Sequence, residues 1–304
     1  MRILITGGAG YIGTELTYKL AALNNIEEII IYDNLSRANY NVFIGAQKLN
    51  NKIKFVHGEL LDSRKLKKIL SGIDVVYHLA AKVTTPFSDQ NPHEFEQTNN
   101  WGTAELTYAL EESEVKKLIY TSSVSVYGAS NEEKTPETPL NPRTFYGISK
   151  MRGEEHMQRI AAKIPTYIAR CGNVYGYSKS MRFDAVINRF MFDANYSGKI
   201  SVNGDGNQKR AFIHIDKLTQ ALVGLLEKDI QPQTFNLVDV NLSISEIIGK
   251  LNEVYPEMEM IFINQHMNMR SVTAVADLNI NKLYSAFNKS FFEELSEFKL
   301  AFTF

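Results

Sequence analysis

Apolar residues in the first 170 positions of the chain follow two alternating patterns. Short, largely β-branched runs occupy residues 2–6, 28–32, 53–57, 75–79, 117–122 and 166–170. Stretches with apolar residues at helical spacing lie between them, at residues 12–24, 63–70, 93–112 and 147–163. Nearly continuous apolar runs are typical of strands buried on both faces, and strands that alternate with helices form parallel sheets. The pattern therefore predicts an α/β fold with a doubly wound parallel sheet.

This alternation breaks down after about residue 172. Strands, shorter helices and turns such as Asn203-Gly-Asp-Gly206 are mixed from there on. We expect residues 1–172 to form the cofactor domain, with residues 211–238 returning to it, and residues 173–304 to form mainly a smaller mixed α/β substrate-binding lobe. Because ligands of doubly wound sheets bind beyond the C-terminal ends of the strands, residues at those ends are the candidates for function.

Composition limits the possible partners and location. The 33 Lys and Arg nearly balance the 34 Asp and Glu, so no bulk field favours nucleic acid or an anionic membrane. No run approaches the ~18 apolar residues of a membrane-spanning helix, and no signal-peptide pattern precedes the first strand. Cys171 is the single cysteine, which excludes an intrachain disulfide and fits a reducing compartment. We expect a soluble, cytoplasmic protein.

Three glycines follow the first predicted strand directly. Gly7, Gly10 and Gly13 lie between the strand at residues 2–6 and the helical stretch at residues 12–24. Gly7 permits a tight turn, Gly10 lets the backbone approach a pyrophosphate, and Gly13 lets helix and strand pack closely. Unpaired N–H groups at the helix N-terminus then bind phosphate oxygens. Glycines also serve ordinary turns, but strand, turn and helix in this order predict a Rossmann-type dinucleotide site.

An acidic residue, Asp33, ends the second predicted strand at about 20 residues past the glycines, where a carboxylate can bind the adenosine ribose. Its charge would repel a 2′-phosphate, which favours NAD over NADP. Asp33 could instead cap the loop at residues 34–36. The nearby Arg37 keeps NADP open as an alternative.

A tyrosine and a lysine stand four residues apart at the start of the last helical stretch. Tyr146 and Lys150 share one helix face, because residues i and i+4 lie one turn apart. A free phenol has a pKa of ~10, so Tyr146 needs help to act as a base near neutral pH. The Lys150 ammonium and a positively charged nicotinamide would stabilise the phenolate. The same spacing also occurs on solvated helix faces, so the pair alone does not establish catalysis.

A run of hydroxyl side chains ends the strand that precedes this helix. It contains Thr121, Ser122, Ser123 and Ser125. Each of them could simply solvate a loop. Beside a Tyr/Lys pair, however, one hydroxyl could hydrogen-bond the substrate oxygen as charge develops on it.

Taken together, these features resemble the extended short-chain dehydrogenase/reductase family, and most of all its nucleotide-sugar epimerases. The resemblance covers nearly the whole chain and keeps the motifs of the family in order. The motifs are Thr6-Gly-Gly-Ala-Gly-Tyr-Ile-Gly13, Asp33-Asn34, Gly58-Glu-Leu-Leu-Asp62, His78-Leu-Ala-Ala81, Asn99-x-x-Gly102-Thr103, Ser122-Ser-Val-Ser-Val-Tyr-Gly128, Tyr146-x-x-x-Lys150, Arg170-x-x-Asn173-Val-Tyr-Gly176, Gly204-Asp-Gly206, Arg210-x-Phe212 and His214-Ile-Asp216. Chance does not account for all of them, so the resemblance implies that the Tyr/Lys pair is catalytic.

The resemblance also implies roles for individual residues. Tyr146 would be the base, Lys150 its activator and Ser123 the catalytic hydroxyl. The implied NAD-binding residues are Gly7, Gly10, Tyr11, Ile12, Gly13, Asp33, Asn34, Glu59, Leu60, Leu79, Ala80, Ala81, Asn99, Tyr146 and Lys150. Among these, Asn99 is similar to an asparagine that orders the end of the active-site strand. Asp62 is an alternative to Glu59 and Leu60 near the adenine, and Lys82 either reaches a phosphate or is solvated.

The residues implied to bind a nucleotide sugar are Ser123, Ser125, Asn173 and Arg210. Asn173 matches a residue that contacts the sugar diphosphate. Arg210 matches an arginine whose guanidinium forks onto that diphosphate. The alternative for Arg210 is a surface ion pair.

Four departures from the family pattern fall on the predicted substrate lobe. Tyr177 replaces a proline, Ala211 replaces an aspartate, and Asn203 replaces an aromatic residue near the nucleotide base. Residues 291–304 also lack the usual closing pattern. These changes leave the nucleotide and the sugar open but do not touch the redox residues.

The resemblance points first to epimerisation at C4 of the sugar through a transient 4-keto intermediate, with no metal required. Dehydration is disfavoured, because Val124-Ser125 follows Ser123 where dehydratases commonly carry Asp-Glu. A net NAD(P)-dependent reductase or dehydrogenase of a nucleotide sugar, and a non-catalytic NAD(P)-binding sensor, are the alternatives. By resemblance we also expect a homodimer, formed through the helical stretches at residues 93–112 and 147–163.

Overall fold

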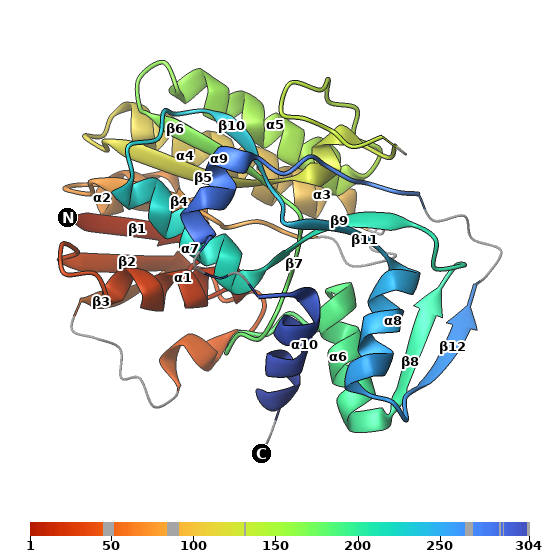
Figure 1. Ribbon diagram of the computed structural model, residues 1–304. Helices are drawn as coiled ribbons and strands as arrows, with labels where there is room; N and C mark the ends of the chain where they lie inside the picture. The colour runs from red at the N-terminus through yellow and green to blue at the C-terminus, as the bar shows by residue number, and fades with distance from the viewer. Residues whose placement is uncertain are drawn as a thin grey trace.

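A seven-stranded sheet in the order β10-β6-β5-β4-β1-β2-β3 forms the centre of the protein (Figure 1). The structure, a computed structural model, describes residues 1–44, 52–83, 91–130, 132–264, 270–285, 287 and 289–302. The strands of this sheet are β1 (Arg2–Thr6), β2 (Glu28–Asp33), β3 (Ile53–His57), β4 (Val75–His78), β5 (Lys117–Ser123), β6 (Thr166–Cys171) and β10 (Thr234–Leu237). All neighbouring pairs are parallel. The predicted doubly wound α/β fold is confirmed.

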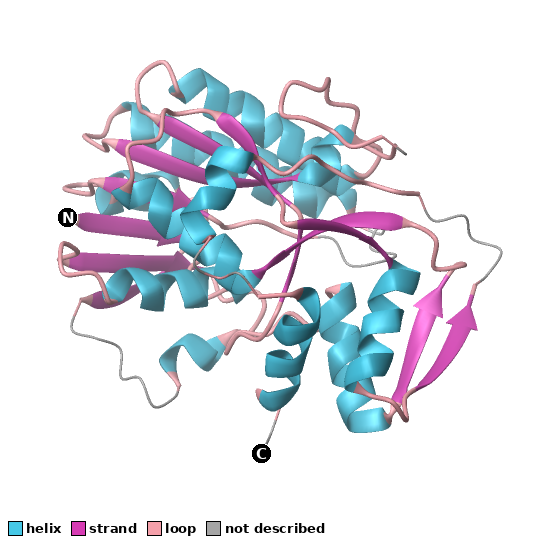
Figure 2. Ribbon diagram, in the orientation of Figure 1, coloured by secondary structure: helices cyan, strands magenta, loops and turns pink. Residues whose placement is uncertain are grey.

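Helices cover both faces of this sheet (Figure 2). The helices that flank the sheet are α1 (Tyr11–Ala21), α2 (Ser63–Ile69), α4 (Gly102–Glu111), α5 (Phe145–Ile160) and α7 (Ile215–Glu227). Successive side chains of a strand point to opposite faces. Accordingly Ile3 packs with residues of α1 and α7, whereas its neighbour Leu4 packs with residues of α2, α4 and α5. Burial on both faces explains why the strands appear as continuous apolar runs.

The helix predicted at residues 93–112 is interrupted. The chain forms α3 (Pro92–Phe95), a π-helical turn, η2 (Glu96–Trp101), and then α4. A π turn inserts an extra residue into the helix and is frequent at functional sites. Asn99 lies in this turn and is buried. The apolar spacing does not reveal the interruption, because a single inserted residue leaves the pattern nearly intact.

The described residues of the second part of the chain include two small sheets and the helices α6, α8 and α10 that pack with them. One sheet has the order β11-β9-β7, and β12 pairs with β8 in the other. The elements are β7 (Asn173–Tyr175), α6 (Val186–Ser197), β8 (Lys199–Asn203), β9 (Lys209–His214), β11 (Val240–Ser243), α8 (Ile244–Val254), β12 (Glu259–Ile263) and α10 (Phe291–Leu300). Phe190, Ile247 and Leu295 contribute to their common core. Residues 303 and 304 of the predicted divergent C-terminus lie outside the described residues.

The chain returns from this second part to the main sheet. After β9, helix α7 packs against α1, and β10 then pairs with β6. The remaining short elements are η1 (Tyr40–Phe43), η3 (Val124–Tyr127), α9 (Leu278–Asn281) and η4 (Lys282–Tyr284). No helix among the described residues is both long and apolar enough to cross a bilayer. The parallel register brings the C-terminal ends of the central strands to one edge, where Thr6 of β1 pairs with His78 of β4.

Candidate active site

The glycine turn between β1 and α1 has no room for side chains. Gly7 has φ +72°, and a Cβ there would lie 2.6 Å from the Cα of Ala80. A Cβ at Gly13 would lie 2.4 Å from the carbonyl oxygen of Gly7. Gly10 is the N-cap of α1 and carries no side chain to shield the first turn. The unpaired N–H groups of that turn therefore face a space into which a pyrophosphate fits.

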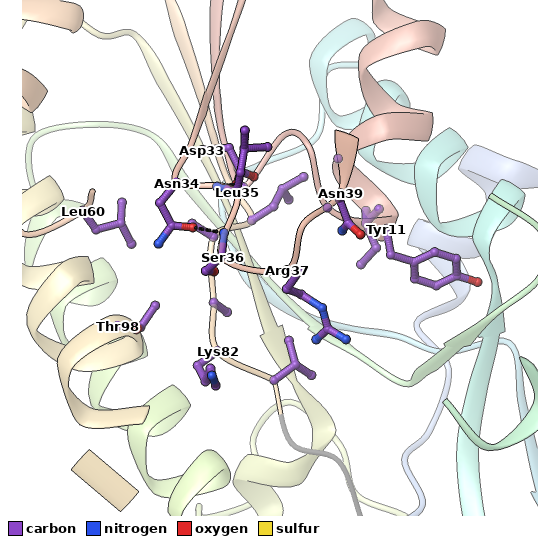
Figure 3. Close-up of a pocket in the computed structure, with 18 of the residues that line it drawn as sticks. Tyr11, Asp33, Asn34, Leu35, Ser36, Arg37, Asn39, Leu60, Lys82 and Thr98 are labelled. Carbon is purple, nitrogen blue, oxygen red and sulfur yellow. Dashed lines mark hydrogen bonds between the residues drawn. The ribbon is translucent and has the colours of Figure 1, made fainter. Parts of the chain in front are cut away.

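A pocket of about 850 Å³ runs past this turn and the ends of β2 and β4 (Figure 3). Twelve of the residues expected to bind the cofactor line it: Gly7, Gly10, Tyr11, Ile12, Gly13, Asp33, Asn34, Glu59, Leu60, Leu79, Ala80 and Ala81. They come from four separate stretches of the chain, which the parallel sheet brings to one edge. A pocket of this size suits a dinucleotide-sized ligand.

Asp33 lies at the end of β2 and lines the pocket. Its carboxylate accepts hydrogen bonds from the backbone N–H of Ala9 at 3.1 Å and of Leu35 at 2.8 Å. Burial raises the pKa of this carboxyl, and the two backbone bonds oppose that effect. A carboxylate has more acceptor sites than these two bonds use. Asp33 thus fixes the loop that follows it and can still accept bonds from a ribose.

The opposite side of the pocket is formed by the chain after β3. The Asn34 amide donates to both carboxylate oxygens of Glu59 at 3.0 Å, and the Tyr32 hydroxyl donates to the Glu59 carbonyl at 2.7 Å. Leu60 completes this wall. Asp62, the alternative residue for the adenine, is not in the wall and instead caps α2 through the Lys65 N–H.

Asn99 lies behind the pocket and holds its wall. Its amide donates to the Lys82 carbonyl at 2.9 Å and to the Ser149 hydroxyl at 3.0 Å, and its oxygen accepts from the Lys82 N–H at 2.8 Å. These bonds tie the Leu79–Ala81 stretch to α5, so Asn99 acts on the cofactor wall through Lys82. The Lys82 ammonium itself pairs with Glu94 at 2.5 Å.

The three proposed catalytic residues are not among the residues that line this pocket, but Tyr146 contacts Ser123 and lies near Phe95 of the lining. Ser123 ends β5 and Tyr146 lies in the first turn of α5. The Tyr146 ring centroid is 6.3 Å from that of Phe95, which lines the pocket. Burial raises the pKa of Tyr146, whereas the charge of Arg182 and a hydrogen bond with Ser123 lower it. Tyr146 therefore needs a further positive charge, such as a nicotinamide, to ionise near neutral pH.

Lys150 is buried one helical turn after Tyr146, with 2% of its surface exposed. Its ammonium lies 4.1 Å from the centroid of the Tyr120 ring, a geometry that stabilises a cation. Burial lowers its pKa from 10.5 to about 7, while Cys171 and Glu154 act in the opposite direction. Near neutral pH the side chain can thus be charged or neutral, and only its charged form would favour a phenolate.

The residues expected to bind the sugar nucleotide form hydrogen bonds with other groups of the protein. The Ser125 hydroxyl donates to that of Ser123 at 2.9 Å. The Asn173 amide donates to the Ala211 carbonyl at 3.0 Å, and Arg210 donates to the Arg270 carbonyl. Arg210 forms no salt bridge with any of the described residues, so the alternative of a surface ion pair has no support there.

Sequence reasoning missed one wall of the pocket. Ser180, Met181 and Arg182 line it from the second part of the chain. No local motif marks them, because they reach the pocket only when the chain after β7 crosses back over α1. Phe95, which ends α3 and lines the pocket, was not predicted either.

The sequence matches, over residues 3–237, the sequence model of a family described as the NAD dependent epimerase/dehydratase family. This match spans most of the chain. The chain belongs to the NAD-dependent epimerase/dehydratase family. It is thus an enzyme of this family and uses NAD, and its membership confirms the resemblance found in the sequence.

Two relatives and one solved structure illustrate the range of this epimerase/dehydratase family. The chain is 30% identical over 276 residues to dTDP-D-glucose 4,6-dehydratase of Homo sapiens, with 85% of this chain and 76% of that protein covered. It is 33% identical over 226 residues to a putative UDP-glucose 4-epimerase of Methanocaldococcus jannaschii, with 72% and 71% covered. UDP-glucuronic acid 4-epimerase of Bacillus cereus, solved with UDP-glucuronic acid and NAD, superposes with TM-score 0.82 at 25% identity over 100% of both chains.

Proposed function

We propose that this enzyme is an epimerase that inverts C4 of a nucleotide-diphosphate sugar. The support is the hydrogen bond between Ser123 and Tyr146 near the cofactor pocket, with Lys150 one helical turn after Tyr146 and with Val124 and Ser125 next to Ser123 along the chain. Relatives named as epimerases of nucleotide sugars add to this support. The sugar would pass through a transient 4-keto state.

Each residue has a defined task in this reaction. Tyr146 takes the proton of the 4-hydroxyl and later returns it, and Ser123 hydrogen-bonds the same oxygen. Lys150 supplies the positive charge that favours the phenolate. NAD, when bound at the glycine turn, supplies the hydride chemistry. Asn173 and Arg210 would hold the sugar diphosphate, with Ser125 beside the sugar.

The residues after Ser123 favour epimerisation over dehydration. Elimination of water requires a further acid and base close to the sugar. Val124 is buried in an apolar cluster, and the Ser125 hydroxyl bonds Ser123. The buried carboxylate of Glu154 is engaged with Arg170 and Ser122. None of these side chains offers a free carboxylate beside the catalytic hydroxyl.

A panel of UDP- and dTDP-linked sugars incubated with the enzyme in D2O tests this function by NMR. A 4-epimer without carbon-bound deuterium is the expected product, since the hydrogen removed from C4 returns to C4. Tyr146→Phe, which keeps the ring but loses the base, should lower turnover by about 10²-fold or more. A product that has lost water and carries deuterium at C5 would identify a dehydratase. Stoichiometric NADH with an oxidised sugar would identify a net dehydrogenase.

We propose further that the enzyme is a homodimer formed through η2, α4 and α5. Three large apolar side chains are exposed there: Trp101 at 61%, Tyr108 at 50% and Phe145 at 43%. Exposed apolar side chains that gather on one face mark interaction surfaces. The apolar spacing of the same helices in the sequence agrees with this face.

We propose a cytoplasmic location and a division into a cofactor domain and a substrate lobe. A single, buried cysteine, Cys171, supports a reducing compartment. The pairing of β10 with β6 supports the return of residues 211–238 to the cofactor domain of residues 1–172, with residues 173–304 otherwise forming the lobe.

A further inference from the structure

The wall of the pocket that sequence reasoning missed is a single segment, residues 176–184, which we call the strap. It follows β7 and precedes α6. Ser180, Met181 and Arg182 of the strap line the cofactor pocket. The strap thus lies beside α1 and the loop after Asp33 and forms one wall of the groove with them.

Hydrogen bonds that involve backbone carbonyls and side-chain hydroxyls join the strap to α1. The Tyr11 hydroxyl donates to the Gly176 carbonyl at 2.6 Å, and the Ser178 hydroxyl donates to the Tyr11 carbonyl at 3.2 Å. The hydroxyls of Thr14 and Ser180 lie 2.8 Å apart, and both residues are fully buried. Hydrogen bonds shielded from water in this way hold a fixed geometry.

The strap is also bonded to the loop that follows Asp33. The Asn41 amide donates to the Lys179 carbonyl at 2.7 Å. Asp184, at the end of the strap, pairs with Arg37 of this loop at 3.1 Å and with Arg182 of the strap at 3.0 Å. Burial would raise the pKa of Asp184, but Arg182 and Arg37 outweigh it and lower the pKa. The bridging carboxylate therefore stays charged at neutral pH.

Each of the three positive side chains Arg37, Lys82 and Arg182 has a carboxylate partner within the part of the chain that the structure describes. Arg37 and Arg182 share the single carboxylate of Asp184, and Lys82 pairs with Glu94. The shared carboxylate links the strap to the loop after Asp33, so the firmness with which the groove is closed depends on Asp184.

We propose that the strap retains NAD in its groove between turnovers, and that Asp184 is the positioning residue that fastens it. Release of the cofactor requires the strap to part from the loop after Asp33, and the Asp184–Arg37 pair opposes this movement. The inference uses the NAD dependence of the family and does not depend on whether the reaction is epimerisation.

The test measures release of NADH from the loaded, full-length enzyme by stopped-flow fluorescence, with excess NAD as the displacing ligand. Asp184→Asn should release NADH about tenfold faster, because a charged, partly buried pair is lost. Asp184→Glu, which keeps the charge, should restore slow release. Asp193→Asn is the matched control, since Asp193 pairs with Arg189 on α6 at 3.4 Å and does not line the pocket.

Two further measurements separate retention from general damage. The cofactor-free Asp184→Asn protein should melt close to the wild type, and its turnover should depend on added NAD. Asn41→Ala, which removes an exposed contact with the strap, should also speed release and serves if Asp184→Asn does not fold. The proposal would be overturned if Asp184→Asn, or Asn41→Ala in its place, released NADH no faster than the wild type. It would also be overturned if Asp193→Asn accelerated NADH release by the same factor.

Discussion

At the scale of single residues, Lys150 shows how the charge of a proposed catalytic residue opposes stability. The side chain is buried, and burial lowers its pKa to about 7. Because this folded value lies below the ordinary 10.5, the unfolded chain binds more protons between about pH 7 and 10.5. The contribution of Lys150 to the free energy of unfolding therefore rises with pH across that window. Below the window, the buried ammonium destabilises the folded protein by its full amount.

Replacing Lys150 by methionine should stabilise the protein and inactivate it. Methionine keeps the volume of the side chain but removes the buried charge, so unfolding at pH 7 should require a few kcal/mol more. Turnover should fall by about 10²-fold or more, because the phenolate loses its ammonium. Chemical denaturation at pH 6 to 10 measures the effect, and the gain should shrink as pH rises.

Lys67→Met is the control for this variant, because Lys67 is exposed and pairs with Glu112 on the surface. It should change stability by less than about 0.5 kcal/mol. A Lys150→Met protein that is no more stable than the wild type at pH 7 would contradict a penalty for the buried ammonium.

Residues whose role depends on local spacing could be predicted from the sequence. Gly7, Gly10 and Gly13 lie within one turn, and Tyr146 and Lys150 lie within one helix, so their relative positions follow from secondary structure alone. The positions of Arg182, which lines the pocket, and of Asp184, which pairs with Arg37, could not be predicted, because they depend on tertiary contacts of the strap with α1 and with the loop after Asp33.

At the scale of elements, the central strands were predictable because burial on both faces leaves a strong apolar run. The interruption of the helix at residues 93–112 was not. Within the π turn, the Asn99 amide bonds Lys82 and Ser149. Such side-chain bonds leave no periodic trace in a sequence.

The junction of β1 and α1 should not tolerate a methyl group. A Cβ at Gly13 would lie 2.4 Å from the Gly7 carbonyl oxygen and 2.6 Å from the Gly8 Cα. Gly13→Ala should therefore cost about 1–3 kcal/mol of stability and weaken NAD binding by at least about tenfold, as measured by thermal unfolding and calorimetric titration.

Gly249→Ala is a matched control in another helix. A Cβ at Gly249 in α8 meets no atom within 4 Å, so alanine should stabilise the protein by about 0.5–1 kcal/mol. Its NAD affinity should equal that of the wild type. Unchanged NAD affinity in Gly13→Ala would show that the turn can move apart, contrary to the packing described above.

At the scale of the whole molecule, the two parts of the chain are joined through Tyr11. Its ring points away from the pocket, and its buried hydroxyl bonds Gly176 and Asn188 (Figure 3). The residue was expected to bind NAD, and its backbone lies where the pyrophosphate fits. Its hydroxyl links the glycine turn to the second part of the chain, a contact that no sequence motif discloses.

Trp101 is the single tryptophan of the chain and lies exposed on the proposed dimer face. Its fluorescence therefore reports on self-association without any label. If two copies meet through η2, α4 and α5, the indole leaves water, and its emission should shift to the blue as protein concentration rises. Tyr108→Asp should keep the emission red-shifted at all concentrations. An emission maximum that stays constant while light scattering shows a dimer would place the contact elsewhere on the surface.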